Sequence, residues 1–251
     1  MIHHRNTYLT EDQSADLLRE QIVRQKAFIF ARFGDGAIEC ITRKRGVTCD
    51  GEVYSEALGN ELIRVWHLLF SKPGTYLGDW FSASFSPESP HGLYRKEYED
   101  LVALVQWNGK FSPTWVHFEA LLLMRESESL AKFYRAIRKD NRKKLLMGPK
   151  EWQPAAAILR ADFFEVPVSP RLFDLYLGEL KYGLKSRDFD VLLYGAGMAG
   201  NIPVVDYWYD HPEKTYINLG SALDPIYRGH TRRQQLSLVR AHRLFTGIVS
   251  R

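Results

Sequence analysis

The sequence of 251 residues has no run of 18 or more apolar residues, and it contains only two cysteines, Cys40 and Cys49. Without such a run we expect no membrane-spanning helix. Two cysteines are too few for a disulfide-stabilised secreted scaffold, and no CxxC spacing indicates a zinc or redox site. The first residues also lack the charged and then apolar layout of a signal peptide. We therefore expect a cytoplasmic protein.

Internal repeats and low-complexity linkers are absent too, and no acidic residue follows Asp224. The segment after it carries six of the 34 Lys and Arg residues, which leaves 28 against 30 acidic residues in the rest of the chain. A second basic cluster occupies residues 135–144. Such clusters bind phosphate-rich partners, although a solvated helix face and a solvated tail explain them as well. We expect one domain over 1–251 that ends in an Arg-rich segment, 226–251.

Short apolar segments alternate with segments of helical spacing along the chain. This alternation predicts an α/β, Rossmann-like fold with a mostly parallel sheet and helices on both faces. Ligands of such sheets bind at the carboxyl ends of the strands. The predicted strands cover 27–33, 144–147, 163–168, 190–194 and 215–219. Helices are predicted over 15–25, through Ile38 and Ile41, and over 58–70, 94–107, 130–139, 151–161, 170–186 and 199–209, with a long loop over 72–90.

The first candidate motif, Gly34-Asp35-Gly36, directly follows the first predicted strand. Glycines permit positive φ and a close approach of the backbone to a ligand. The Asp35 carboxylate would lie at the carboxyl edge of the sheet, where it could meet a metal ion or a sugar hydroxyl. The alternative is that Asp35 only caps the following helix.

The second candidate is the sequence Gly195-Ala196-Gly197-Met198-Ala199-Gly200, which matches G-x-G-x-x-G between a predicted strand and a predicted helix. Backbone amides at the helix N-terminus could hold a pyrophosphate. NAD binding fits poorly, because that motif usually follows the first strand of its fold. A tight strand-to-helix turn without a ligand remains the alternative.

The third candidate, from Gly220 and Ser221 to Asp224, follows the last predicted strand. Its amides, hydroxyl and carboxylate, together with Arg232 and Arg233, predict a clamp for a diphosphate, since arginine binds phosphate oxygens bidentately. A structural turn at Asp224-Pro225 is the alternative. The carboxyl ends of parallel strands meet at one edge, so we expect the three motifs to converge.

The combination of Arg32-Phe33-Gly34-Asp35-Gly36, the late glycine loop and the closing Asn218-Leu219-Gly220-Ser221-Ala222-Leu223-Asp224 resembles the GT-D-type glycosyltransferase superfamily. The resemblance extends over about residues 27–233 and is patchy between the motifs. It implies a Rossmann-like enzyme that uses a nucleotide-sugar donor, a UDP-sugar first of all. The family signature reads Arg-(Phe/Tyr)-Gly-Asp-Gly-Glu, and its Asp-x-Glu part is associated with a divalent metal, Mn or Mg, and with the donor. The match places Asp35 at the family's aspartate.

This sequence departs from the signature at Ala37, where the family has glutamate. Two nearby carboxylates could compensate: Glu39, which would share a helix face with Asp35, and Glu52 of Asp50-Gly51-Glu52. Without a metal, Arg232 and Arg233 would have to offset the charge of the leaving diphosphate.

Transfer to a hydroxyl also needs a base, or an enclosed route without one. The candidates are Asp35, His91, and the pair His117 and Glu119, although a histidine among aromatics is more often a hydrogen-bonded core residue. Aromatic residues of the long loop could stack on a sugar or a base, or form a lid or plain core: Trp80, Phe81 and Phe85.

The sequence therefore predicts a glycosyltransferase whose donor is a nucleotide sugar. The basic clusters favour duplex DNA as the partner, with a hydroxymethylated pyrimidine as acceptor, a viral DNA hypermodification in the host cytoplasm. A glycan or glycoprotein acceptor is the alternative within the same class. A nucleotide- or nucleic-acid-binding protein without catalysis also remains open, and Ala37 is its best support.

Overall fold

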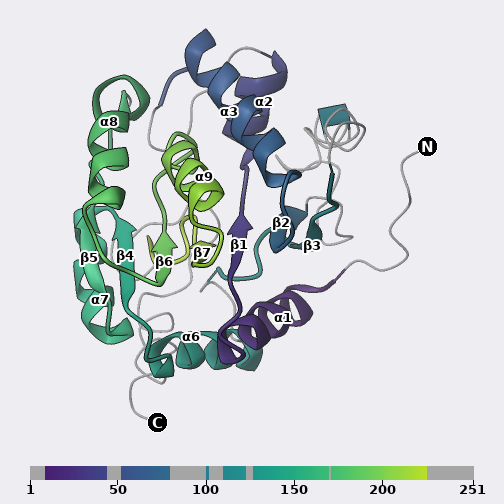
Figure 1. Ribbon diagram of the computed structural model, residues 1–251, viewed down its shortest axis with the longest axis vertical. Helices are drawn as coiled ribbons and strands as arrows, with labels where there is room; N and C mark the ends of the chain where they lie inside the picture. Colours follow the sequence, from purple (N-terminus) through teal and green to yellow (C-terminus); the bar gives the residue numbers. More distant parts are fainter. Residues whose placement is uncertain are drawn as a thin grey trace.

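The computed structural model describes residues 9–43, 52–79, 100–101, 110–122, 127–169 and 171–224. Its centre is a seven-stranded sheet in the order β3-β2-β1-β7-β6-β4-β5 (Figure 1). All neighbouring strands pair in parallel. The strands are β1 (Phe28–Ala31), β2 (Thr75–Asp79), β3 (Thr114–His117), β4 (Lys144–Gly148), β5 (Asp162–Glu165), β6 (Val191–Tyr194) and β7 (Thr215–Asn218).

Helices cover both faces of this sheet. One apolar cluster joins the sheet to α2 (Asp35–Arg43), α3 (Glu56–Leu69), α8 (Leu172–Lys185) and α9 (Asn201–Asp210). The opposite cluster joins it to α1 (Glu11–Val23), α6 (Glu128–Lys139) and α7 (Gln153–Leu159), which follows the short 3-10 helix η1 (Lys150–Trp152). The helices α1 and α6 lie side by side (Figure 1). The predicted Rossmann-like class is thereby confirmed.

The central strands are apolar on both faces because both faces are covered. In β1, Phe28 and Phe30 pack toward α1 and α6, whereas Ile29 and Ala31 pack toward α2 and α3. All four residues are at most 1% exposed. Such a strand reads as a continuous apolar run, which is why the sequence pattern locates it well.

The connections whose helices are among the described residues follow one rule. Those that step toward β3, from β1 to β2, β5 to β6 and β6 to β7, cross on the face of α2, α3, α8 and α9. Those that step toward β5, from β3 to β4 and β4 to β5, cross on the opposite face. This separation is what a single handedness of crossover produces.

All five strands predicted from the sequence are present, but β2 and β3 were not predicted. The strand β2 lies inside the predicted loop over 72–90, where glycine and proline suggested irregular structure. Its Gly78 has a packing reason instead: a Cβ there would lie 3.0 Å from the Phe118 ring and 3.4 Å from Cγ of Arg32. The predicted helix over 94–107 falls almost entirely outside the described residues.

The helix α1 begins four residues before its predicted start. The Thr10 hydroxyl accepts from the Gln13 amide, and the Gln13 side chain accepts from the Thr10 amide, which forms a capping box.

None of the helices in the described part of the chain has the length and hydropathy of a membrane-spanning segment.

Candidate functional site

The loop after β7 leaves the sheet in a different direction from the loops of its two neighbours. The chain after β1 enters α2 on one face, where Ala37 and Ile38 are buried, and the chain after β6 enters α9 on the same face. After β7, by contrast, Leu219, Ala222 and Leu223 are buried on the opposite face. Adjacent strands whose loops diverge in this way form a topological switch point, where open α/β sheets bind their ligands. The same criterion holds between β6 and β4, because the chain after β4 enters η1 and α7 on the face of α1 and α6.

Arg32 and Gly220 meet at the switch point between β1 and β7. The Arg32 side chain is buried, its Nη1 donates to the Leu219 carbonyl at 3.0 Å, and its Cζ lies 4.2 Å from the centre of the Phe118 ring. Gly220 has φ +56°, and a Cβ there would lie 2.1 Å from Nη1 of Arg32. A side chain at position 220 would therefore displace the guanidinium. Gly34 and Gly36, for which positive φ was considered, do not have it, whereas Gly220 does.

The positive charge of Arg32 reaches the surrounding core. Burial raises the pKa of the Tyr194 hydroxyl, while a hydrogen bond with Asn218 and the charge of Arg32 act in the opposite direction. Burial likewise raises the pKa of Tyr134, and Arg32 again opposes the shift. A fixed cation thus lies at the carboxyl edge of the sheet, next to two neutral phenols.

Two asparagines that the sequence did not single out as site residues join these loops. Asn201, the first residue of α9, donates from Nδ2 to the Arg32 carbonyl at 3.1 Å. Its Oδ1 accepts from Asn218 Nδ2 at 2.9 Å and from the Tyr194 hydroxyl at 3.2 Å. The Asn218 Oδ1 in turn accepts from the Gly220 amide at 2.7 Å. In the sequence, only the position of Asn201 directly after the glycine loop, at the start of a predicted helix, could have indicated that it belongs to the site.

The glycine loop over 195–200 fits its surroundings tightly. A Cβ at Gly195 would lie 2.3 Å from the Trp152 ring and 2.4 Å from the Gly220 carbonyl oxygen. Gly197 has φ +61°, and a Cβ at Gly200 would lie 2.3 Å from Cβ of Ala196. Each glycine of the motif therefore has a structural reason that involves no ligand.

The backbone amides at the start of α9 also have partners within the protein. The amides of Gly200, Asn201 and Ile202 donate to carbonyls of residues 196, 198 and 199. The Ala199 amide donates to Oε2 of Glu52 at 3.4 Å. These contacts favour the interpretation of this loop as a strand-to-helix turn. Ala196 and Met198, both predicted to contact the donor, are buried, whereas Gly197 is exposed.

Glu52, considered above as a substitute metal ligand, is instead a buried carboxylate that accepts hydrogen bonds from the backbone of Phe173 and Ala199. It is 2% exposed, and its Oε1 accepts from the Phe173 amide at the start of α8 at 3.0 Å. It therefore links the N-terminus of α8 to the glycine loop. Burial and the charge of Glu52 raise the pKa of the Cys40 thiol to about 11.

The third motif also lies at this edge. The Trp152 indole donates to Oδ1 of Asp224 at 2.9 Å, so Asp224 links η1 to the chain after β7. Ser221 is exposed beside Gly220. The predicted convergence of the three motifs is thus borne out by the Arg32–Leu219 hydrogen bond and by the packing of Gly195 against Trp152 and Gly220.

The first motif forms the start of α2. The Gly34 carbonyl accepts from the Ile38 amide at 3.0 Å, and Asp35 is the first residue of the helix, followed by Gly36. The side chain of Asp35 lies outside the described part, whereas Glu39 is half-buried. Ala37 is 1% exposed in the apolar core under α2. A glutamate at position 37 would have to bury its carboxylate there.

His117 is at the carboxyl end of β3, and it is 1% exposed. Its Nδ1 accepts from the Glu119 amide at 3.1 Å, and its Nε2 lies 3.7 Å from Oε1 of Glu11. This geometry favours the interpretation of His117 as a hydrogen-bonded core residue. His91, Trp80, Phe81 and Phe85 lie outside the described residues.

The described residues do not supply a metal site of the kind that the resemblance implies. Within the described ranges, no group of three or more His, Cys, Asp or Glu side chains is placed to hold an ion. The position of the family's glutamate, Ala37, is apolar and buried. We therefore derive no catalytic step through a metal ion.

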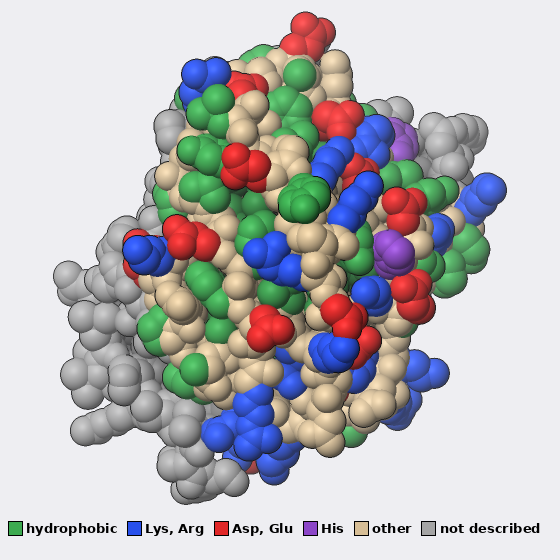
Figure 2. Space-filling view, turned by 60° about the vertical axis from the view of Figure 1, so that its left-hand side comes forward, with side chains coloured by type: hydrophobic (Ala, Val, Ile, Leu, Met, Phe, Trp, Pro, Cys, Tyr) green, Lys and Arg blue, Asp and Glu red, His purple; other side chains and the backbone are tan. Residues whose placement is uncertain are grey.

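The basic run over 135–144 divides into two parts. Its last three basic residues support the fold: Arg142 pairs with Asp140 at 2.7 Å, Lys143 pairs with Asp188, and Lys144 donates to the Asp140 carbonyl. The charged surface around the sheet is otherwise mixed, with Lys and Arg gathered on the lower part of the face in Figure 2.

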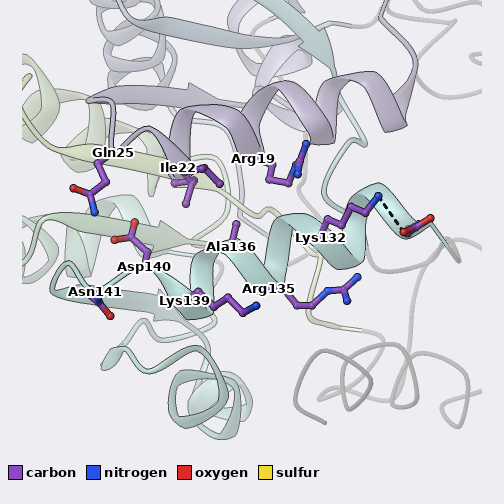
Figure 3. Close-up of a pocket in the computed structure, with 11 residues that line it drawn as sticks. Arg19, Ile22, Gln25, Lys132, Arg135, Ala136, Lys139, Asp140 and Asn141 are labelled. Carbon is purple, nitrogen blue, oxygen red and sulfur yellow. Dashed lines mark ion pairs between the residues drawn. The ribbon is translucent and has the colours of Figure 1, made fainter. Parts of the chain in front are cut away.

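The first part of the run borders a groove of about 490 Å³ between α1 and α6. Arg19 from α1 and Lys132, Arg135 and Lys139 from α6 line it (Figure 3). Lys132 pairs with Glu128 at 3.0 Å, and Arg19 pairs with Asp16 at 3.3 Å. Among the described residues, Arg135 and Lys139 have no carboxylate within 4.0 Å. This groove is separate from the switch point. Arg232 and Arg233 lie outside the described residues.

Comparison with known proteins shows the fold. No protein-family model matches the sequence, and no curated protein matches it. Solved structures of a domain of unknown function, DUF1792, share the architecture. One, described as having a distinct glycosyltransferase fold, has 18% sequence identity and a TM-score of 0.57 over 91% of this chain and 89% of that chain. Another, described as a new glycosyltransferase from Streptococcus sanguinis, has 12% identity and a TM-score of 0.59 over 93% and 89%. A third DUF1792 structure has 16% identity and a TM-score of 0.55 over 91% and 89%.

Proposed function

We propose that this protein is a glycosyltransferase that binds a nucleotide-sugar donor between the ends of β1 and β7. The observation that carries the proposal is the buried Arg32 guanidinium, held against the backbone of Gly220 at a topological switch point. The fold shared with structures described as glycosyltransferases supports the same class.

The proposed reaction breaks the bond between the anomeric carbon and the diphosphate oxygen, and joins that carbon to an acceptor hydroxyl oxygen. The departing nucleoside diphosphate carries the developing negative charge. A preorganised cation in a site closed to water stabilises such charge more than a solvated one does. Arg32 supplies this cation, and the first turn of α2, whose N–H groups face the carboxyl edge of the sheet, adds partial positive charge.

Asp35 has the role of orienting the donor sugar or accepting the acceptor proton. It begins α2, one residue after Gly34 and three after Arg32, so it lies at the same edge. Gly36, Gly220 and Ser221 border the donor in this proposal, and Arg232 and Arg233 close on its diphosphate. Glu39 is the second carboxylate on α2. UDP is the first nucleotide to test, and Asp224 keeps its structural contact to Trp152.

The test is release of nucleoside diphosphate from a panel of nucleotide sugars, with and without manganese. Asp35→Asn should abolish release while the circular dichroism spectrum stays unchanged. Asp162→Asn is the matched control, because it makes the same carboxylate-to-amide change at an exposed residue at the amino end of β5. This variant should act as wild type. Wild-type turnover by the Asp35 variant contradicts the proposed site. No turnover of any donor by the wild type favours the binding protein without catalysis.

For the acceptor we propose a hydroxymethylated pyrimidine in DNA, because the groove between α1 and α6 presents four basic side chains, two of them without a carboxylate partner among the described residues. DNA binding through such charges weakens steeply with salt. Arg135→Glu with Lys139→Glu should reduce duplex binding and the salt dependence, whereas Lys110→Glu with Lys185→Glu changes the net charge equally at exposed sites elsewhere. Mass spectrometry of digested DNA identifies a glycosylated base. Diphosphate release without a modified base favours a glycan acceptor.

A further inference from the structure

A closed circuit of hydrogen bonds connects the loop after β1 to the loop after β7. The Gly220 amide donates to Asn218, the Asn218 amide group donates to Asn201, and the Asn201 amide group donates to the Arg32 carbonyl. The Arg32 guanidinium closes the circuit by donating to the carbonyl of Leu219, the residue between Asn218 and Gly220. The backbone and the side chain of Arg32 are therefore both tied to the β7 loop.

The partners determine how the Asn201 amide is oriented. If its oxygen and nitrogen were exchanged, Nδ2 would face Asn218 Nδ2 at 2.9 Å, and Oδ1 would face the Arg32 carbonyl at 3.1 Å. Two donors would then oppose each other, and so would two acceptors. Asn201 is 2% exposed and Asn218 is 5% exposed, so water does not substitute for a lost partner.

We propose that Asn201 is a positioning residue that holds the Arg32 guanidinium at the place where the leaving diphosphate develops its charge. Asn201 does not touch the proposed donor; it acts through the Arg32 carbonyl and through Asn218. An amide at this position is required because one side chain must accept twice and donate once. The kinetic consequence rests on the proposed function, whereas the structural consequence does not.

The substitution Asn201→Asp tests the requirement with almost no change of shape. The ionised carboxylate still accepts from Tyr194 and Asn218, but it presents an oxygen to the Arg32 carbonyl. A misplacement of about 1 Å lowers catalysis by about 10²-fold, so we expect kcat to fall by that order while the KM for the donor changes less. A protonated carboxyl has both a donor and an acceptor. Burial and the facing Arg32 carbonyl raise the pKa of the introduced carboxyl, whereas the Tyr194 and Asn218 donors and the Arg32 guanidinium lower it. We expect burial and the facing carbonyl to dominate, so activity relative to wild type should recover as the pH is lowered from about 8 to about 5.5.

The matched control is Thr215→Val, at the opposite end of β7. The Thr215 hydroxyl donates to the Lys26 carbonyl at 2.9 Å and accepts from Arg142, and the residue is fully buried. This variant loses buried hydrogen bonds of the same strand, but away from Arg32. It should be less stable than wild type and should keep kcat and its pH profile.

Amide hydrogen exchange over 32–38 and 218–222 provides a readout that needs no activity. We expect faster exchange in both segments for Asn201→Asp at high pH, with protection restored at low pH, and no such change for Thr215→Val. Wild-type kcat together with wild-type exchange in Asn201→Asp would overturn the inference. If wild type turns over no donor, the proposed function fails and exchange alone decides. If Asn201→Asp does not fold, Asn218→Asp interrupts the same circuit at its other amide and replaces it, with the same outcomes.

Discussion

Gly220→Ala is the most direct test of the close contact at the switch point. Gly220 has φ +56°, a conformation that costs alanine about 1–2 kcal/mol. The new Cβ would also lie 2.1 Å from Nη1 and 2.9 Å from Cζ of Arg32, so the guanidinium has to move. It then loses its hydrogen bond to Leu219, which contributes about 1.5–3 kcal/mol for a charged donor, and its contact with Phe118, which contributes about 0.5–2 kcal/mol.

If the guanidinium loses both contacts, the free energy of unfolding should therefore fall by about 3–7 kcal/mol, as measured by urea denaturation. A double-mutant cycle separates the two causes. In an Arg32→Ala background there is no guanidinium to displace, so Gly220→Ala should cost only the backbone term of about 1–2 kcal/mol. Gly178→Ala is the control, because a Cβ there meets nothing within 4 Å and Gly178 lies inside α8. That variant should be more stable by about 0.5–1 kcal/mol.

A cycle with no coupling between positions 32 and 220 would refute the reasoning, even if Gly220→Ala is destabilising by itself. The cause would then be the backbone conformation alone. Equal effects of the alanine substitutions at positions 220 and 178 would show that the surroundings of Gly220 impose no special demand.

Two further substitutions and one labelling experiment test other contacts among the described residues. Trp152→Phe removes the indole donor to Asp224 and leaves a partly buried carboxylate without it, so unfolding should need about 1–3 kcal/mol less, as thermal denaturation will show; an unchanged midpoint would contradict the role given to Asp224. Burial and Glu52 raise the pKa of Cys40 to about 11, so its thiol stays protonated at pH 8, and iodoacetamide should modify it only as fast as the protein opens. Peptide mapping separates Cys40 from Cys49, and rapid modification of Cys40 in the folded protein would contradict its burial. Gly195→Ala should destabilise by more than 2 kcal/mol, because its Cβ would meet the Trp152 ring and a backbone carbonyl, and less loss in a Trp152→Ala background would confirm the cause.

The sequence predicted four strands that are buried on both faces, and also the partly exposed edge strand β5. β1, β4, β6 and β7 read as apolar runs, because helices cover both sides of them. The strand β2 escaped prediction since Pro73, Gly74 and Gly78 interrupt its pattern. The reason for Gly78 is a contact with Phe118, which is 40 residues away in the chain. No local pattern contains that information.

The location of the candidate site was predictable from the sequence, but the contacts of Arg32, Asn201 and Asn218 within it were not. Consecutive polar and glycine residues at strand ends predicted that the motifs meet, and they do meet around Arg32, Gly195 and Gly220. The strand order decides which loops become neighbours, and that the loops after β1 and β7 are neighbours became evident only from the pairing of these two strands. The glycine loop over 195–200 had the stronger motif, yet its Gly195, Ala199 and Gly200 amides donate within the protein, to Met147, Glu52 and Ala196.

These observations favour Arg32 over the glycine loop as the mark of the site. At the start of α9, the Ala199 amide already donates to the buried Glu52, and the next three amides donate to backbone carbonyls, so these four groups are not free to bind a diphosphate. The end of β1 offers the opposite arrangement, with a cation whose backbone and side chain are both anchored to the neighbouring loop. The Arg32 guanidinium lies beside Gly220, whose positive φ and close contact leave no room for a side chain at that position. In the proposed glycosyltransferase, Ala37 replaces the glutamate of the Asp-x-Glu signature that the sequence otherwise resembles, so a fixed positive charge of this kind would stabilise the diphosphate as it leaves.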